Sequence, residues 1–206
     1  MKRTFLAAVG ISLAAALAAP AVAQAAPAAA KPTLAQILLS DSKKDAANGF
    51  DSNPNDFDIV TQALLAFPDL TAAASDPTAN LTVFLPTDYA FRALVRSLTG
   101  HTYYKESDIF NAVVSLGLPT VKAVLMYHIV AGRIDYATAL KADGAKLTTL
   151  EGDTITVHVL GRGFKRVVLE DGAAALRDPK VIRANIMASN GIAHVIDRVL
   201  VPPMAG

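Results

Sequence analysis

Residues 190–202 read Asn-Gly-Ile-Ala-His-Val-Ile-Asp-Arg-Val-Leu-Val-Pro and constrain the architecture more than any other segment of this 206-residue chain. Asn190 and Gly191 both tolerate the positive φ of a type I′ turn, so the pair predicts a β-hairpin with strands over 181–189 and 192–201. The second strand is apolar on both faces, as a central strand is. His194 lies on one of these faces, and we expect it to be a core histidine.

The segment 81–91 gives a second strong pattern, Leu-Thr-Val-Phe-Leu-Pro-Thr-Asp-Tyr-Ala-Phe. Its apolar first half predicts a buried strand that Pro86 ends, and Thr87 is placed to cap a helix through about Val95.

Helical spacing predicts further helices over 33–40, 59–67, 107–117, 121–129 and 135–142, the second of them capped by Asp56 or Asp58 and stopped by Pro68. Strict alternation over 153–160 predicts a half-exposed antiparallel strand, and 166–169 a short strand after it. Helices dominate the first part of the chain and an antiparallel sheet the last part. This order indicates an α+β fold in one domain.

The hydrophobic content of 52% is unevenly distributed, because the first 30 residues hold 14 alanines. Lys2 and Arg3 precede an uncharged apolar run over 5–19, and Ala21-Val22-Ala23 forms a small-residue cleavage site. We expect a signal peptide over 1–23, an Ala/Pro-rich tether over 24–32, one domain over 33–203 and a tail over 204–206. The mature chain would then be secreted or periplasmic, with no transmembrane segment.

The charge balance argues against nucleic acid as a partner. The leader carries two bases and no acid, so its removal changes the formal net charge from +1 to −1. A nearly neutral chain has no bulk field that attracts polyanions. Without cysteine it forms no disulfide, no zinc–thiolate cluster and no lipidated cysteine.

Three segments, in order, carry a family resemblance. Residues 82–91 resemble the first conserved box of fasciclin-like domains, and residues 190–202 resemble the second. Between them, residues 125–132 (Leu-Met-Tyr-His-Ile-Val-Ala-Gly) are similar to the tyrosine–histidine helix end of that family. The resemblance covers nearly the whole mature chain, although 41–58 and 98–115 are longer than the usual spacings.

The resemblance implies an antiparallel β-wedge of about seven strands packed with several helices. It also implies a non-catalytic module for cell adhesion or for contacts with extracellular matrix or envelope components, without a cofactor. By the same likeness, Thr87, Asn190, Gly191, His194 and Asp197 are structural motif residues.

Four residues are candidates for partner contact: Tyr127, His128, Asn185 and Ile186. We expect Tyr127 to be partly exposed, whereas the apolar face that His128 shares with Leu125 favours a buried, hydrogen-bonded histidine. Asn185-Ile186 stands where animal adhesion members carry an Asp-Ile pair linked to integrin-type binding. That route is therefore doubtful here, and no Arg-Gly-Asp triplet occurs.

Alternatives to an adhesion module follow from other features. Some relatives are similar to carriers of apolar pigments such as carotenoids, which makes a carrier of an apolar small molecule the second interpretation. Asp51, Asn53 and Asn55 have the first spacings of a calcium loop, but Asp56 and Gln62 replace its glycine and its bidentate glutamate, which favours a plain polar loop. The sequence has no Gly-x-Ser-x-Gly pentapeptide and no His-Glu-x-x-His metal motif, so we expect neither an enzyme nor a metal site.

Overall fold

The computed structural model describes residues 31–42 and 49–203, so the expected signal peptide, most of the tether and the tail lie outside the described residues. Over this part the chain forms seven helices and seven strands. The helices are α1 (Leu34–Ser42), α2 (Asp58–Leu65), α3 (Pro68–Ser75), α4 (Asp88–Thr99), α5 (Glu106–Val114), α6 (Leu118–Tyr127) and α7 (Tyr136–Ala139). The strands are β1 (Leu81–Pro86), β2 (Ile129–Ala131), β3 (Lys146–Thr148), β4 (Thr154–Leu160), β5 (Arg166–Glu170), β6 (Val181–Ala188) and β7 (Gly191–Ile196).

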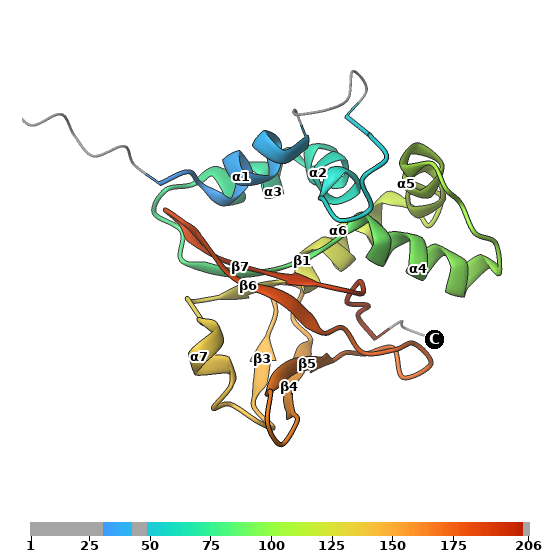
Figure 1. Ribbon diagram of the computed structural model, residues 1–206. Coiled ribbons are helices and arrows are strands. Elements are labelled where there is room, and N and C mark those ends of the chain that lie inside the picture. The colour runs from blue at the N-terminus through green and yellow to red at the C-terminus, as the bar shows by residue number, and fades with distance from the viewer. Residues whose placement is uncertain (1–30, 43–48, 204–206) are drawn as a thin grey trace, which may run out of the picture.

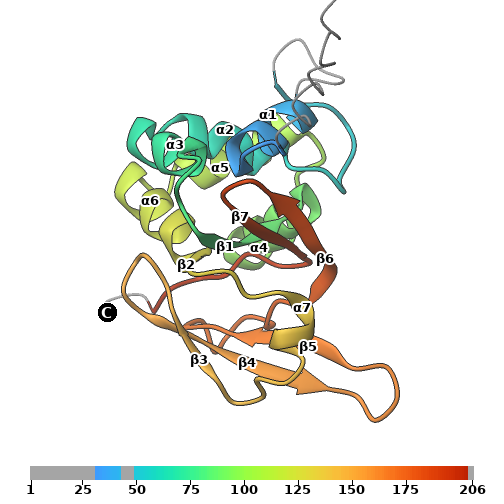
Figure 2. The same ribbon diagram turned by 90° about the vertical axis from the view of Figure 1, so that its left-hand side faces the viewer.

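The strands form two sheets, one of four strands in the order β2-β1-β7-β6 and one of three in the order β3-β4-β5. Bridges from Val130 to Thr149 and from Val168 to Lys180 join the sheets. Figure 1 shows the four-stranded sheet in the middle of the molecule, with α1 to α6 on one side and the three-stranded sheet with α7 on the other. Figure 2 shows the same three layers from the side. The expected α+β wedge of seven strands is confirmed.

One pairing differs from the antiparallel expectation. Strand β1 runs parallel to β7 along its whole length, from Leu81 beside Gly191 to Pro86 beside Ile196. All other strand pairs are antiparallel. A central strand that is apolar on both faces carries no local signal for the direction of its neighbour, so the sheet is mixed.

The alternation of β1 and β7 divides the apolar residues between two cores. Leu85, Ala193 and Val195 pack against the helices, whereas Phe84 and Ile196 face the second sheet. The strict alternation expected for β4 is confirmed, since Ile155 and Val157 are buried in the second core. The fold therefore holds a helix–sheet core and a sheet–sheet core on opposite faces of β1 and β7.

Local sequence signals explain most element ends. The Thr87 hydroxyl accepts a hydrogen bond from the Ala90 N–H and caps α4, as expected, and the Asp135 side chain caps α7 in the same way. The Pro68 expectation is incomplete: α2 has already ended at Leu65, and Pro68 opens α3. Proline suits the first helical turn, where its missing N–H leaves no hydrogen bond unmade.

The hairpin forms at the expected place with a different turn. Ala188 pairs with Gly191, so the turn residues are Ser189 and Asn190, and neither has a positive φ. The type I′ prediction is therefore wrong. A Cβ on Gly191 would lie 2.6 Å from the Leu81 carbonyl oxygen and 2.8 Å from Leu34 Cδ1, so the close approach of β1 and α1 requires glycine here.

No single helix of the described residues has the length and apolar composition of a membrane span. Helices α5 and α6 meet that test only when taken together as a pair, across a bend of 105°.

Candidate functional site

The Tyr127–His128 pair is buried, which corrects the expectation of a partly exposed tyrosine. Tyr127 has no exposed surface, and its hydroxyl donates to the Thr154 carbonyl at 2.9 Å. Burial raises the Tyr127 pKa to about 12. Because Tyr127 packs between the two sheets, it is not available for partner contact in this structure.

His128 is the buried, hydrogen-bonded histidine that the sequence favoured. Its Nδ1 lies 2.7 Å from the Val124 carbonyl oxygen, and its Nε2 accepts a hydrogen bond from the Leu200 N–H at 3.0 Å. These partners define a neutral ring that donates through Nδ1. Burial lowers the His128 pKa to about 4, so the ring stays neutral at physiological pH and links α6 to the segment after β7.

Asn185 and Ile186 lie at an irregularity in β6. The register of β6 against β7 shifts between Arg183 and Ile186, and Asn185 adopts a φ of 59°. The exposed Asn185 side chain accepts from the Tyr136 N–H at 2.9 Å, so it anchors α7 to the sheet. This bulge is the one part of the expected contact set that reaches the surface, since Asn185 is exposed and Ile186 half-buried.

The motif residues of the second box act inside the fold. The Asn190 side chain accepts from the Leu34 N–H and donates to the carbonyls of Ala74 and Asp76, all at 2.9 Å, and so ties α1 and α3 to the hairpin. His194 is 2% exposed, with Nε2 at 2.8 Å from the Ile134 carbonyl oxygen.

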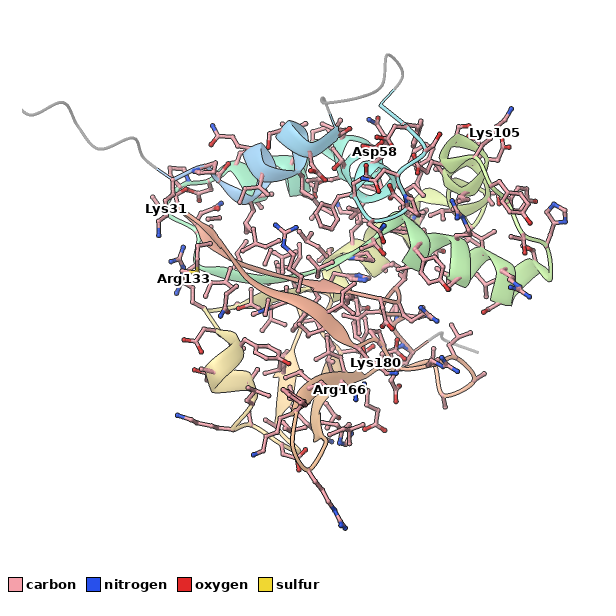
Figure 3. The ribbon with its side chains drawn as sticks, in the orientation of Figure 1. Lys31, Asp58, Lys105, Arg133, Arg166 and Lys180 are labelled. Carbon is pink, nitrogen blue, oxygen red and sulfur yellow. The ribbon has the colours of Figure 1, made fainter. Side chains whose placement is uncertain are left out.

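Two charged side chains complete this framework. Asp197 accepts from the Lys180 N–H at 2.8 Å. At the hairpin end, where Figure 3 labels Arg133, that guanidinium donates to the carbonyls of Ala188, Ser189 and Gly191.

The two long segments meet in a cluster of carboxylates, in the helical layer where Figure 3 labels Asp58. The Asp51 N–H donates both to Asp58 Oδ2 at 3.0 Å and to Glu106 Oε2 at 2.9 Å. Asp88 accepts from the N–H groups of Asp58 and Ile59 at 3.1 and 3.0 Å. Helix α2 is therefore capped by Asp88, from a distant part of the chain, and not by Asp56 or Asp58 as expected.

Burial determines the protonation of this cluster. It raises the pKa of Asp88 to about 10, an effect strengthened by the hydrogen bond with Asp56. Burial, with the neighbouring acids, also raises the pKa of Glu106 to about 7 and that of Asp58 to about 6. The Asp56–Asp88 pair therefore favours a shared proton, and the cluster carries less negative charge than its composition suggests.

Part of the cluster has the spacing of cation ligands. One carboxylate oxygen each from Asp51, Asp58 and Glu106 lie within 4.8 Å of one another. Within the loop itself, Asp51 and Asn53 accept hydrogen bonds from backbone N–H groups two residues ahead. The polar-loop interpretation accounts for these turns. Calcium binding, which the sequence did not favour, stays an untested alternative, and a titration at millimolar calcium that releases no heat would end it.

An apolar cavity of about 60 Å³ lies beneath α1 and α3. A cavity of about 150 Å³ is needed to hold benzene, so this one is too small for a carotenoid as it stands. Its walls come from α1, α2, α3, β1 and α6, and include Leu34, Leu38, Leu70, Leu81, Val83 and Leu125.

A polar recess with a volume of about 320 Å³ lies beside α4. Four arginines line it: Arg92 and Arg96 from α4, Arg177 from the β5–β6 connection and Arg198 after β7. Tyr89, Ala93, Ser97 and Thr102 complete the lining. We call this site the arginine recess.

Sequence reasoning missed the arginine recess and the distant members of the carboxylate cluster. Tyr89, Arg92 and Arg96 follow one another at helical spacing, which was a usable signal for one polar helix face. Nothing local indicates that Arg177, Arg198 or Glu106 would join residues so far away in sequence.

The comparisons agree with this architecture. A family model described as the fasciclin domain matches residues 55–202. Protein sll1483 of Synechocystis sp. (strain ATCC 27184 / PCC 6803 / Kazusa) is 35% identical over 127 residues, which cover 60% of this chain and 56% of that protein. This chain therefore spans only about half the length of its curated relative.

A solved structure gives a further match. It is a FAS1 domain pair from the insect cell adhesion molecule fasciclin I, 18% identical, with a TM-score of 0.49, covering 68% of this chain and 43% of that one. The family match spans more than half of the sequence and includes both conserved boxes. The chain is therefore a member of the fasciclin domain family.

Proposed function

We propose that this chain is a non-catalytic interaction domain that acts outside the cytoplasm, in cell adhesion or in binding matrix or envelope components. The observation that carries the proposal is the arginine recess. The recess, of about 320 Å³, presents guanidinium groups, hydroxyls and an aromatic ring, which are suited to bind partners through directed hydrogen bonds.

The buried histidines support a role without catalysis. Both ring nitrogens of His128 have backbone partners, and so do both of His194, whose Nδ1 accepts from the Asn185 N–H at 3.3 Å. A histidine with both nitrogens bound to backbone is not free to act as a general base. The two histidines of the family motifs therefore serve the framework.

The location outside the cytoplasm rests on the leader-like residues 1–23. Mass spectrometry of the protein recovered from its host tests it. A mature chain that begins at Gln24 is the expected result, and a chain that keeps residues 1–23 in the cytosolic fraction would contradict the proposal.

Pull-down from envelope or matrix material tests the binding function. The wild-type protein should retain a partner that washing at 0.15 M salt does not remove. An Asn185→Ala protein tests the bulge on β6 separately, because it leaves the residues that line the arginine recess unchanged; loss of the partner in this variant would assign binding to the bulge. No retained partner from any extracellular fraction would overturn the proposal.

A carrier of an apolar small molecule is the second candidate, favoured by the cavity beneath α1, whose lining residues are all apolar except His128. Ligand pockets generally measure about 300–1,000 Å³, so α1 or α3 would have to move outward to admit a pigment. Protein purified from its own host should absorb visible light if it carries a carotenoid. A colourless protein that takes up no carotenoid on mixing would remove this candidate.

A further inference from the structure

The arginine recess brings together three segments that are distant in sequence. Arg92 and Arg96 are one turn apart on α4, so they lie on the same helix face. Arg177 and Arg198 approach from the connection after β5 and from the segment after β7. Figure 1 shows α4 on the same side of the molecule as the β5–β6 connection and the C-terminal segment.

The positive charges of the recess are largely uncompensated. None of the lining residues is acidic. Among the described residues, Arg198 forms a long ion pair with Asp197, with 3.9 Å between Nη1 and Oδ2. The four guanidinium groups thus leave an excess of positive charge around one hollow.

The hydrogen-bonding capacity of these arginines is only partly filled, although Arg198 Nη1 donates to the Asp197 carbonyl. Arg92 Nη2 donates to the Tyr104 carbonyl at 3.3 Å, but its Nε is buried without a hydrogen-bond partner. Arg198 lies 5.5 Å from the centre of the Tyr89 ring, which fixes its guanidinium at the edge of the hollow.

We infer that the arginine recess binds the sulfate or phosphate ester groups of an extracellular polysaccharide. The inference rests on the proposed function, because it names the chemistry of the partner. Arginine forks pair with the oxygens of such esters in a bidentate manner. Donors that come from three separate segments suit a tetrahedral group, whose oxygens point in several directions, better than a planar carboxylate.

The form of the site favours a polysaccharide over a nucleic acid. Proteins that bind nucleic acid spread basic residues along a stripe and often stack bases on aromatic rings. Here the charges gather in a single hollow, and its one aromatic ring, Tyr89, already lies against Arg198. The volume of about 320 Å³ corresponds to a small ligand group and not to a long track.

The test compares dextran sulfate with unsulfated dextran by isothermal titration at 0.15 M salt. The wild-type protein should bind dextran sulfate and not dextran. The double variant Arg96→Gln/Arg177→Gln changes two exposed side chains of the recess and should weaken binding about tenfold or more. The control Arg162→Gln/Arg166→Gln removes the same charge from two exposed positions, one in the loop before β5 and one at the first residue of β5, which Figure 3 labels. It should change affinity less than about twofold.

Further arms separate the sources of the anion. Inorganic sulfate and phosphate should compete with dextran sulfate, and the one that competes at lower concentration identifies the ester. Polygalacturonate, whose charges are carboxylates, should bind more weakly. Equal losses in both double variants, tighter binding of polygalacturonate, or no binding of dextran sulfate would overturn the inference. If those results came with a partner still retained in the pull-down, the interaction function would stand and the ligand chemistry would fail.

Discussion

Replacing Gly191 with alanine should destabilise the protein by about 2–4 kcal/mol. A Cβ at this position would lie 2.6 Å from the Leu81 carbonyl oxygen and 2.8 Å from Leu34 Cδ1, whereas ordinary contacts begin near 3.4 Å. Strand β1 would have to move by about 0.8 Å, and overpacking of this kind costs about 1–3 kcal/mol. The same movement strains the hydrogen bond from the Leu81 N–H to the Asn190 carbonyl, which is worth about 1 kcal/mol.

The assay is urea unfolding followed by far-ultraviolet circular dichroism, because the chain has no tryptophan. Gly163→Ala is the matched control, since a Cβ at Gly163 meets nothing within 4 Å and no positive φ is recorded there. We expect the control to change stability by less than about 0.5 kcal/mol. If the Gly191→Ala midpoint also moved by less than this amount at an unchanged slope, the glycine would not be required by the parallel approach of β1 and β7.

Three further predictions concern buried polar groups. Burial raises the Glu106 pKa from 4.5 to about 7, so the stability that the protonated side chain contributes is present below pH 4.5 and is lost as the pH rises through 7. Between pH 5 and pH 8, the free energy of unfolding of the Glu106→Gln protein, measured in urea with EDTA, should therefore rise by up to about 3 kcal/mol relative to wild type. A difference that does not change with pH would contradict the burial effect. The His128 ring, whose pKa burial lowers to about 4, should keep the NMR shifts of a neutral imidazole down to pH 5, whereas the Glu170 carboxylate raises the pKa of His158. Because His128 is protonated more readily in the unfolded chain, the protein should lose stability as the pH falls from 6.5 towards 4. If both rings titrated together, the burial of His128 would be refuted. Asn190→Ala leaves three backbone groups without their partner and should lower the free energy of unfolding by about 2–4 kcal/mol, as measured by thermal or urea unfolding. Ser189→Ala, at the exposed neighbouring position, should change it hardly at all. Equal effects of the two substitutions would refute the anchoring role of Asn190.

Local patterns predicted most elements of this fold. Apolar alternation located β4, an apolar run after the Asn-Gly pair located β7, and a side-chain cap located the start of α4. These features depend on neighbours within four residues, so one sequence is enough to find them. The parallel pairing of β1 with β7 depends on two segments more than a hundred residues apart, and no local pattern encodes it.

Asn190 and Gly191 illustrate how a sequence pattern can predict the right structure for the wrong physical reason. Their composition predicts a hairpin because both tolerate a positive φ, and the hairpin is present. In the structure the asparagine is selected by its hydrogen bonds to α1 and α3, and the glycine by the space that β1 leaves. Dihedral preference and tertiary packing favour the same residues here, so the sequence could not distinguish them.

The candidate sites were harder to predict because the net charge of a sequence counts buried and exposed charged residues alike. A net charge near zero argues against anionic partners only if acids and bases are exposed alike. Asp58, Asp88 and Glu106 are buried with raised pKa values, while Arg96 and Arg177 are exposed at the arginine recess. Folding therefore withdraws negative charge from the surface and leaves the positive charge beside α4. A chain that is neutral in sequence thereby gains a locally positive surface, to which we assign anionic esters, and the comparison of sulfated with unsulfated dextran tests that assignment.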